Sequence, residues 1–464
     1  MVAQAKQSGQ EWNQETPCVG TAMSNEWRAK PDDGMLRVVL TADNHLSAYS
    51  PKLAPARLVE RRRRLGLAFK QTVDTAIERH AHLFVQAGDL FDTVDPRNKE
   101  RDFVAEQLSR LPSAGIRTFG VSGNHDTPRQ RTEQGGIAPQ GIYDRLGGMH
   151  FFDSSDNLEP VLSEVAGLRV AVVGLSYRPN IPPGGDPLDQ LQIVDPEGVI
   201  AQADLGILIL HAAIEGHAFP GEMETFVRRR SLAGLEGFRV VLAGHVHGYD
   251  RFSIGDKSIV VCGATELMEF GQSADTVGFV YLELTRHGLR HAEHVPIIPQ
   301  PRHVIALRTT ELWPVVQRLQ KDASPEHAQS IATQVDGAPL PSVTEQILQK
   351  IEPYCTADAM VRLTLEGPIT RDQYHELDVR GIWLYGQQRA FSFEVDENRL
   401  FLSSDFSPEG IERGERVAPR ETLETVIQEW MVKAETPETR ALLSKTRQRV
   451  LDRYDELSGR EPGQ

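Results

Sequence analysis

The stretch VVLAGHVHGYD, residues 240–250, ends an apolar run with two histidines that are two positions apart. Residues two apart on an extended chain point to the same face, so both imidazoles can reach one point beyond the end of a strand. A metal ion would use this arrangement, but an ordinary hydrogen-bonded turn could also contain it. The pair indicates a metal site only if other parts of the chain supply further ligands.

Four other apolar runs end in polar clusters of the same kind. They are MLRVVLTADNH (35–45), AHLFVQAGDLFD (81–92), GIRTFGVSGNHD (115–126) and LGILILHAAIEGH (205–217). Short apolar runs bounded by glycine predict buried strands, and the apolar periodicity of residues 57–79 and 100–110 predicts helices between them. Alternating strands and helices predict an α/β sheet, whose ligands bind beyond the carboxyl ends of the strands. All five clusters lie at such ends, which predicts one convergent site.

The five strand ends together supply seven candidate metal ligands. They are Asp43, His45, Asp89, Asn124, His211, His245 and His247. Nitrogen and oxygen donors without a thiolate favour manganese, iron or zinc over calcium. Seven ligands are too many for one ion but suit two ions that share a carboxylate, and such a pair can clamp both oxygens of a phosphoester displacement. Each cluster alone is as well explained by a turn or a structural histidine, but five clusters at strand ends favour the metal site.

Composition limits the class of protein. A chain of 464 residues with 40% hydrophobic and 25% charged residues is typical of a soluble protein of two or three domains. No apolar run approaches the roughly 20 residues that span a bilayer, and the N-terminus resembles no signal peptide, so we expect a cytoplasmic protein without a membrane partner. Three scattered cysteines argue against a disulfide framework and a cysteine zinc site. The net charge of −15 means that a nucleic-acid partner would need local basic patches or metal ions.

The order D-x-H, GD-x-x-D, GNHD, H and GH-x-H resembles that of the calcineurin-like metallophosphoesterase superfamily. The resemblance implies a β-sandwich flanked by helices and a catalytic His125 that is oriented by Asp92. It further implies one metal held by Asp43, His45, Asp89 and His247, and a second held by Asp89, Asn124, His211 and His245.

The later stretch VVCGATELMEFGQ, residues 260–272, resembles the SbcD-type nucleases of DNA double-strand-break repair. That resemblance implies exonuclease action on duplex ends, endonuclease action on single strands, two Mn²⁺ ions, an SbcC-type coiled-coil ATPase as partner, and a homodimer. One departure is Ser47, where the family often has glycine. Small-phosphoester hydrolysis by the same metals is the alternative enzyme function, and a binding scaffold without activity is a third possibility that an intact His125 disfavours.

Three basic clusters lie between the metal motifs and could contact DNA phosphates around the site. They comprise Arg61, Arg62, Arg63, Arg64, Arg129, Arg131, Arg228, Arg229 and Arg230. The competing interpretation is that the first cluster forms the solvated face of a helix.

The domain organisation follows from shifts in composition along the chain. We expect a disordered tail over 1–34, the phosphoesterase domain over 35–295, a small α+β capping domain over 300–405 and an amphipathic helical hairpin over 419–460. The resemblance implies that the hairpin docks on the ATPase, but an amphipathic hairpin could equally pack on its own domain.

Overall fold

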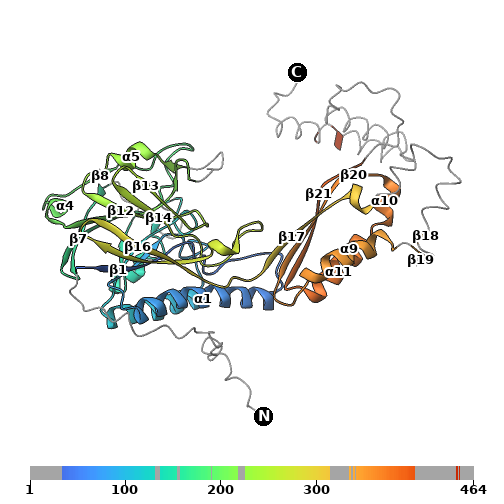
Figure 1. Ribbon diagram of the computed structural model, residues 1–464, viewed down its shortest axis with the longest axis horizontal. Coiled ribbons are helices and arrows are strands. Elements are labelled where there is room, and N and C mark those ends of the chain that lie inside the picture. Colours follow the sequence, from blue (N-terminus) through green and yellow to red (C-terminus); the bar gives the residue numbers. More distant parts are fainter. Residues whose placement is uncertain are drawn as a thin grey trace, which may run out of the picture. The chain divides into compact units, whose positions relative to one another are not determined.

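The computed structural model describes residues 34–130, 136–153, 157–189, 191–217, 225–313, 334–335, 338–339, 341–402, 446–447 and 449. The chain divides into two compact units, Met1–Leu402 and Ser403–Gln464. All described sheets lie in the first unit, where two six-stranded sheets pack face to face (Figure 1). The predicted tail and most of the predicted hairpin lie outside the described residues.

The first sheet has a parallel centre and an antiparallel edge. Its order is β16 (Gly288–Pro296), β15 (Gly278–Thr285), β1 (Leu36–Thr41), β2 (Leu83–Ala87), β3 (Arg117–Val121) and β4 (His150–Phe152). Strands β1 to β4 run parallel, whereas β15 pairs antiparallel with β1. The carboxyl ends of β1, β2 and β3 therefore meet at one edge of the sheet.

The second sheet also has a parallel centre. Its order is β13 (Asp250–Ile254), β14 (Lys257–Val261), β12 (Phe238–Gly244), β9 (Leu205–His211), β7 (Leu168–Leu175) and β6 (Val161–Val165). Strands β14, β12, β9 and β7 run parallel, and Gly244 at the end of β12 pairs with His211 at the end of β9. Two short pairs complete this part: β5 (Asn157–Leu158) with β8 (Gln192–Ile193), and β10 (Ala213–Ile214) with β11 (Phe226–Val227).

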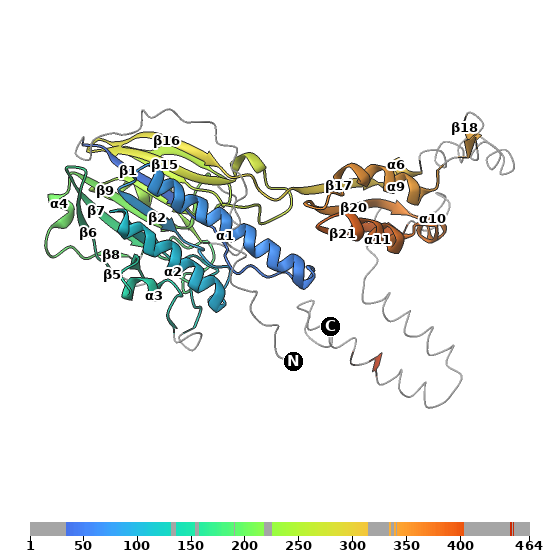
Figure 2. The same ribbon diagram turned by 90° about the horizontal axis from the view of Figure 1, so that it is seen from below.

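Helices cover the outer face of the first sheet, where α1 (Pro55–Glu78) and α2 (Asn98–Ser113) lie side by side (Figure 2). Helix α1 begins at a proline, whose fixed φ suits a first helical turn. Its inner face buries Leu65, Phe69 and Val73 completely, as the apolar periodicity predicted. The shorter helices are α3 (Gly141–Arg145), α4 (Val199–Gln202) and α5 (Arg229–Ala233).

The core explains why the strand sequences are almost continuously apolar. Every residue of β1 and β2 is buried, because one face of the sheet packs on helices and the other on the second sheet. The predicted β-sandwich flanked by helices is confirmed.

Residues 302–402 form a smaller layer with its own apolar core. It contains β17 (Arg302–Arg308), α6 (Thr309–Leu312), β18 (Gln334–Val335), β19 (Ala338–Pro339), α9 (Val343–Ile351), β20 (Met360–Ile369), α10 (Arg371–Glu376), α11 (Val379–Arg389) and β21 (Ser392–Leu402). Strands β17, β20 and β21 are all parallel, so helices cross between them in α/β order rather than in the α+β order that we expected. The alternation of Val361, Leu363 and Leu365 indicates a sheet with one well-packed face but contains no information about strand direction.

Candidate metal centre

The candidate site lies where the two sheets of the sandwich present their strand ends to each other. Strands β1, β2 and β3 supply ligand-bearing loops from one sheet, and β9 and β12 supply them from the other. A parallel bridge between Ala42 and Ala264 joins the loop after β1 to the loop after β14. The five ligand-bearing loops are far apart in sequence, and they meet because the carboxyl ends of these strands lie at one end of the sandwich.

The backbone of the site is held in an unfavourable conformation. Asp43, His45, Asp89 and His245 have φ angles of 49°, 46°, 52° and 88°, in the left-handed region that residues with a Cβ usually avoid. These are four of the seven non-glycine residues with positive φ in the described chain. Such conformations persist when the surrounding structure enforces them, and they concentrate at functional sites.

The first ligand group contains Asp43, His45 and His247, whose ligand atoms lie within 4.8 Å of one another. His45 Nε2 is 3.2 Å from His247 Nε2, and His247 Nε2 is 3.8 Å from Asp43 Oδ1. Imidazole nitrogens that face each other this closely are the arrangement expected of two ligands that share one ion. This group fits a divalent cation.

The second ligand group is arranged around His211. His211 Nε2 lies 3.2 Å from Asn124 Oδ1 and 3.3 Å from Asp89 Oδ2, and His245 Nδ1 lies 3.0 Å from Asn124 Oδ1. Asp89 Oδ2 is also 3.9 Å from His45 Nε2 in the first group. Asp89 is therefore the carboxylate that both groups can share.

Neighbouring acceptors set the orientation of two of the histidine rings. His211 Nδ1 donates to the carbonyl of Ala87 at 2.8 Å, and His45 Nδ1 donates to Asp92 Oδ1 at 3.1 Å. Each contact directs Nε2 of the same ring towards the centre, as outer-shell partners do in metal sites.

Gln272 is a part of the site that the sequence alone did not reveal. Its side-chain nitrogen lies 2.8 Å from His247 Nδ1, and its oxygen accepts from the backbone nitrogens of Met268 and Glu269. Gln272 ends the stretch 260–272, so the family motif was the only signal that could have drawn attention to it.

The electrostatics of the centre reflect burial together with opposite charges. Burial raises the pKa of Asp43 to about 6 despite the opposing effect of His211. Burial alone would lower the pKa of His211, but the Asp89 carboxylate raises it to about 9. Burial would raise the pKa of Asp89, but His211 holds it well below its usual range. Burial and the neighbouring His45 lower the pKa of His247 to about 3, so this ring is neutral and ready to bind a cation.

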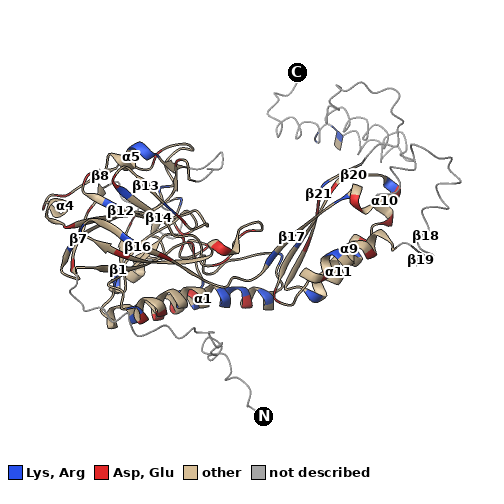
Figure 3. Ribbon diagram, viewed as in Figure 1, with Lys and Arg blue, Asp and Glu red and all other residues tan. Residues whose placement is uncertain are grey.

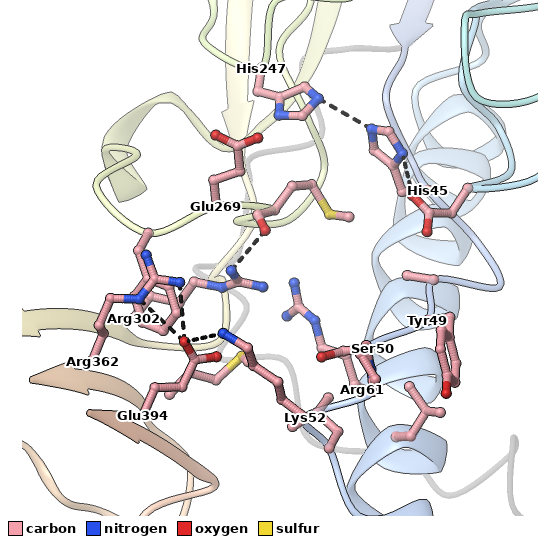
Figure 4. A pocket seen from close by; sticks show the side chains of 18 of the residues that line it. His45, Tyr49, Ser50, Lys52, Arg61, His247, Glu269, Arg302, Arg362 and Glu394 are labelled. Atoms are coloured by element: carbon pink, nitrogen blue, oxygen red, sulfur yellow. Dashed lines mark hydrogen bonds and ion pairs between the residues drawn. The ribbon is translucent and has the colours of Figure 1, made fainter. Parts of the chain in front are cut away.

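His125 lies beside the ligand groups with a more open environment. Its side chain is 43% exposed, and its Nδ1 is 3.4 Å from Asp92 Oδ1. Its backbone nitrogen donates to Asp89 Oδ1 at 2.9 Å, which ties the GNHD loop to the shared carboxylate. His125 and Asp92 line one cavity of about 570 Å³ together with His45 and His247. Figure 4 shows His45 and His247 in this cavity.

Two glycines allow the loops to approach this closely. A Cβ on Gly88 would stand 2.2 Å from His211 Nδ1, and a Cβ on Gly123 would stand 2.1 Å from Asp89 Oδ1. Ser47 has φ 72°, a left-handed conformation that glycine adopts at less cost than serine.

The arginines at 61–64 are engaged within the protein. The guanidinium of Arg61 is buried and lies 3.1 Å from Glu266 Oε2, and Arg62 donates to the carbonyl of Ala48. Arg63 and Arg64 both pair with Glu60. Basic and acidic residues both occur along α1 (Figure 3), which matches a helix face with several ion pairs.

The remaining predicted arginines have different surroundings. Arg129 lines a second cavity, of about 240 Å³, together with Asn124 and His125. Arg228 precedes α5, and Arg229 contacts His217 at 3.2 Å; neither lines the two cavities that contain His125. Arg230 lies in α5, and Arg131 lies outside the described residues.

Comparison with known proteins agrees with this geometry. Residues 36–249 match the family model of the calcineurin-like phosphoesterases. Together with the sandwich and its ligand-bearing strand ends, the match shows that residues 36–249 form a calcineurin-like phosphoesterase domain.

The chain is also similar to archaeal DNA double-strand break repair proteins. It is 28% identical to Mre11 of Sulfolobus acidocaldarius over 201 residues, which is 43% of this chain and 48% of that protein. It is 25% identical to Mre11 of Sulfurisphaera tokodaii over 259 residues, 54% of this chain and 62% of that protein. For Mre11 of Saccharolobus solfataricus the identity is 24% over 300 residues, 62% of this chain and 70% of that protein. The chain thus spans about half to two thirds of the first two relatives.

No helix among the described residues is long and apolar enough to cross a membrane.

Proposed function

We propose that this protein is a two-metal phosphodiesterase that cleaves DNA in double-strand-break repair. The observation that carries the proposal is the position of Asp89. Its Oδ2 atom lies 3.3 Å from His211 Nε2 and 3.9 Å from His45 Nε2, so one carboxylate can serve two adjacent ions. A shared carboxylate between two nitrogen and oxygen donor groups is the arrangement that phosphoester hydrolysis by two metals requires.

Each residue has a definite role in this proposal. Asp43, His45, Asp89 and His247 would hold one ion, and Asp89, Asn124, His211 and His245 would hold the other. The donor set suits Mn²⁺, which the family resemblance also favours. When bound, the ions supply Lewis-acid activation of the phosphodiester and of the attacking water.

His125 is the residue that we assign to proton transfer. Its contact with Asp92 orients the ring, and its exposed side chain opens into the cavity where a substrate would lie. In that position, the ring can hold a proton and deliver it to the departing oxygen. Asp92 also contacts His45, so a single carboxylate positions one ligand and the proposed acid.

DNA as substrate is supported by the relatives and by one basic residue near the chemistry. The three archaeal proteins are DNA double-strand break repair proteins by name. Arg129 lines a cavity with His125 and Asn124, where its positive charge can meet a backbone phosphate next to the scissile one. Exonuclease action on duplex ends, endonuclease action on single strands, a homodimer and an SbcC-type ATPase partner complete the proposal.

Hydrolysis of small phosphoesters is the second candidate function. The observation in its favour is that Arg61, Arg62, Arg63 and Arg64 have intramolecular partners, so a DNA phosphate would have to compete with those partners at the densest of the predicted clusters. Two metal ions by themselves hydrolyse many phosphoesters, so the surrounding surface must decide between the two candidates.

The deciding experiment compares three substrates with the full chain and Mn²⁺: linear duplex DNA, circular single-stranded DNA and a chromogenic phosphodiester. We expect cleavage of both DNA substrates with kcat/KM at least a hundredfold above that for the small diester. Asp89→Asn should abolish all three activities and bind fewer than two metal ions per chain. The loss of activity in this variant is the control for a contaminating nuclease. Efficient turnover of the small diester without cleavage of DNA would favour the second candidate.

A further inference from the structure

The cavity that two of the candidate metal ligands, His45 and His247, line has a second, basic end (Figure 4). His45 and His247 lie at one end of it, and Lys52, Arg302 and Arg362 lie at the other. Lys52 comes from the loop between β1 and α1, whereas Arg302 and Arg362 come from β17 and β20. We call Lys52, Arg302 and Arg362 the distal basic cluster.

A single carboxylate faces the distal basic cluster. Glu394 Oε2 lies 2.9 Å from Lys52 Nζ and 3.2 Å from Arg362 Nη2. Arg362 Nε also donates to this oxygen at 3.3 Å, in a side-on contact through two nitrogens. Lys52 and Arg362 thus share one carboxylate, and Arg302 adds a third positive charge to the lining of this end of the cavity.

Arg302 is the least satisfied member of the cluster. Its Nη1 donates to the carbonyl of Met268 at 2.7 Å, but its Nε is buried without a hydrogen-bond partner among the described residues. Burial and the nearby charge of Arg61 lower the pKa of Arg302 to about 10, so the guanidinium remains charged at neutral pH. Arg302 therefore contributes a positive charge to the lining of the cavity, and charged guanidinium groups bind anions strongly.

An aromatic ring holds the two guanidinium groups beside each other. The Phe270 ring centroid lies 4.2 Å from the guanidinium carbon of Arg362 and 5.4 Å from that of Arg302. Cation–π contact of this kind keeps two like charges close together without neutralising either of them. The distal basic cluster is therefore pre-organised.

We propose that the distal basic cluster binds a backbone phosphate of the nucleic acid that is not the scissile phosphate. Glu394 occupies this subsite until that phosphate displaces it. The inference rests on the proposed function and adds a place where a polynucleotide differs from a small phosphoester. A phosphodiester presents two anionic oxygens, and arginine binds such oxygens in the same side-on manner as a carboxylate. A small diester that reaches only the metals would not contact this end.

The competing explanation is that Glu394, Lys52 and Arg362 only join the 302–402 layer to the loop before α1. The two explanations predict opposite signs for one variant. If Glu394 competes with a phosphate, then Glu394→Gln should strengthen DNA binding, whereas Lys52→Gln should weaken it. If the contacts are only structural, both variants should act in the same direction or have no effect.

The protein offers a matched control pair on the same layer. Arg308 Nε lies 3.1 Å from Glu366 Oε1, and the side-chain exposures of 69% and 23% resemble the 63% and 18% of Lys52 and Glu394. Neither control residue lines the cavity. Thermal denaturation of all four variants and of Arg362→Gln establishes that the comparison is made on folded protein.

The first measurement is the affinity of the Mn²⁺-free full chain for a fluorescent single-stranded oligonucleotide. We expect about tenfold weaker binding for Lys52→Gln and Arg362→Gln, about threefold tighter binding for Glu394→Gln, and no change for Arg308→Gln and Glu366→Gln. Weaker binding or no change in Glu394→Gln would overturn the proposal.

The second measurement uses oligonucleotides in which one phosphate at a time is replaced by a neutral methylphosphonate. The protein should lose about tenfold in affinity at one position away from the scissile phosphate, and Arg362→Gln should abolish that sensitivity. Binding that depends on this phosphate without any DNA cleavage would support the subsite and reject the proposed function. DNA cleavage by a protein whose affinity is unchanged by each of the methylphosphonate replacements would support the proposed function and reject the subsite.

Discussion

At the scale of single residues, the candidate centre depends on histidine rings in which a hydrogen-bond acceptor fixes the proton on one ring nitrogen and leaves the other nitrogen for a metal ion. His211 donates from Nδ1 to the Ala87 carbonyl, and His45 donates from Nδ1 to Asp92. In both rings Nε2 remains for the centre, so the outer contacts are as important as the candidate ligands themselves. His125 differs because its side chain is 43% exposed, and Asp92 lies 3.4 Å from it.

This difference predicts that ligand and acid roles can be separated by mutation. His125→Asn should retain two Mn²⁺ ions but lose about 10²–10⁴ in kcat, because positioned proton transfer typically contributes that much. His247→Ala should instead lose metal, because Nε2 of His247 lies 3.2 Å from that of His45. Metal content after gel filtration and kcat at saturating Mn²⁺ distinguish the two variants. Equal loss of metal from both would contradict the assignment of His125.

The protonation of His211 leads to a prediction about pH. Its pKa is raised to about 9 by Asp89 although burial opposes this, so the ring of the metal-free protein is protonated at pH 7. A metal can bind only after that proton leaves, so metal affinity should rise with pH until about pH 9, by up to about tenfold per unit. Calorimetric titration with Mn²⁺ in buffers of different ionisation enthalpy should register the release of about one proton at pH 7. Release of no proton between pH 7 and 8 would show that His211 is already neutral.

Some properties of single residues could be predicted from the sequence, and others could not. The ligand types could be identified because each follows an apolar run. Arg61 could not be separated from its neighbours in RRRR, since its burial depends on Glu266, 205 positions further along the chain. The same holds for Gln272, whose contact with His247 depends on the shape of the loop after β14.

At the scale of elements, parallel strand ends and close glycine contacts create the site. Gly123 lies in the loop after β3, where a Cβ would stand 2.1 Å from Asp89 Oδ1 and 2.6 Å from the Asp89 backbone nitrogen. The loops after β2 and β3 are therefore in contact through a position with no room for a side chain. Strand ends and their order were predictable from apolar runs, but this distance between two loops was not.

Gly123→Ala should separate these loops and weaken the second metal site. We expect a loss of about 1–3 kcal/mol of stability, as in other overpacked sites, and the loss of one of two Mn²⁺ ions. Gly148→Ala is the matched control, because its nearest contact would be an ordinary 3.6 Å from Leu108 Cβ. Chemical denaturation and metal analysis provide the readouts. Full occupancy by two ions in Gly123→Ala would contradict this prediction, because it would show that the two loops can move apart without weakening metal binding.

In the 302–402 layer, the direction of the strands could not be predicted from the sequence. The apolar residues Val361, Leu363 and Leu365 at every second position were visible in the sequence, but the parallel pairing of β17, β20 and β21 was not. Direction depends on how helices cross between strands, and residues 314–333, between α6 and β18, lie outside the described chain. A pattern of period two establishes a face of a sheet and leaves its topology open.

At the scale of the whole molecule, the described apolar cores all lie in the first compact unit. The largest one fills the sandwich, and another fills the 302–402 layer. The second unit begins at Ser403, and the amphipathic stretch predicted over 419–460 belongs to it. Two roles remain open for that stretch, as a partner-binding hairpin or as part of the protein's own fold.

Deletion of residues 419–464 should distinguish these roles. If the stretch binds an SbcC-type ATPase, the truncated chain should change in stability by less than about 1 kcal/mol, because it removes no residue of the described cores. It should also retain two Mn²⁺ ions and nuclease activity on single-stranded DNA, yet fail to co-purify with the ATPase. A full-length variant with an introduced charge, Trp430→Glu, is the companion test, because a charged residue in the predicted amphipathic stretch should block docking without shortening the chain. Aggregation of the truncated protein, or loss of its cooperative thermal transition, would instead assign the stretch to intramolecular packing, since exposed apolar surface would then have lost its cover.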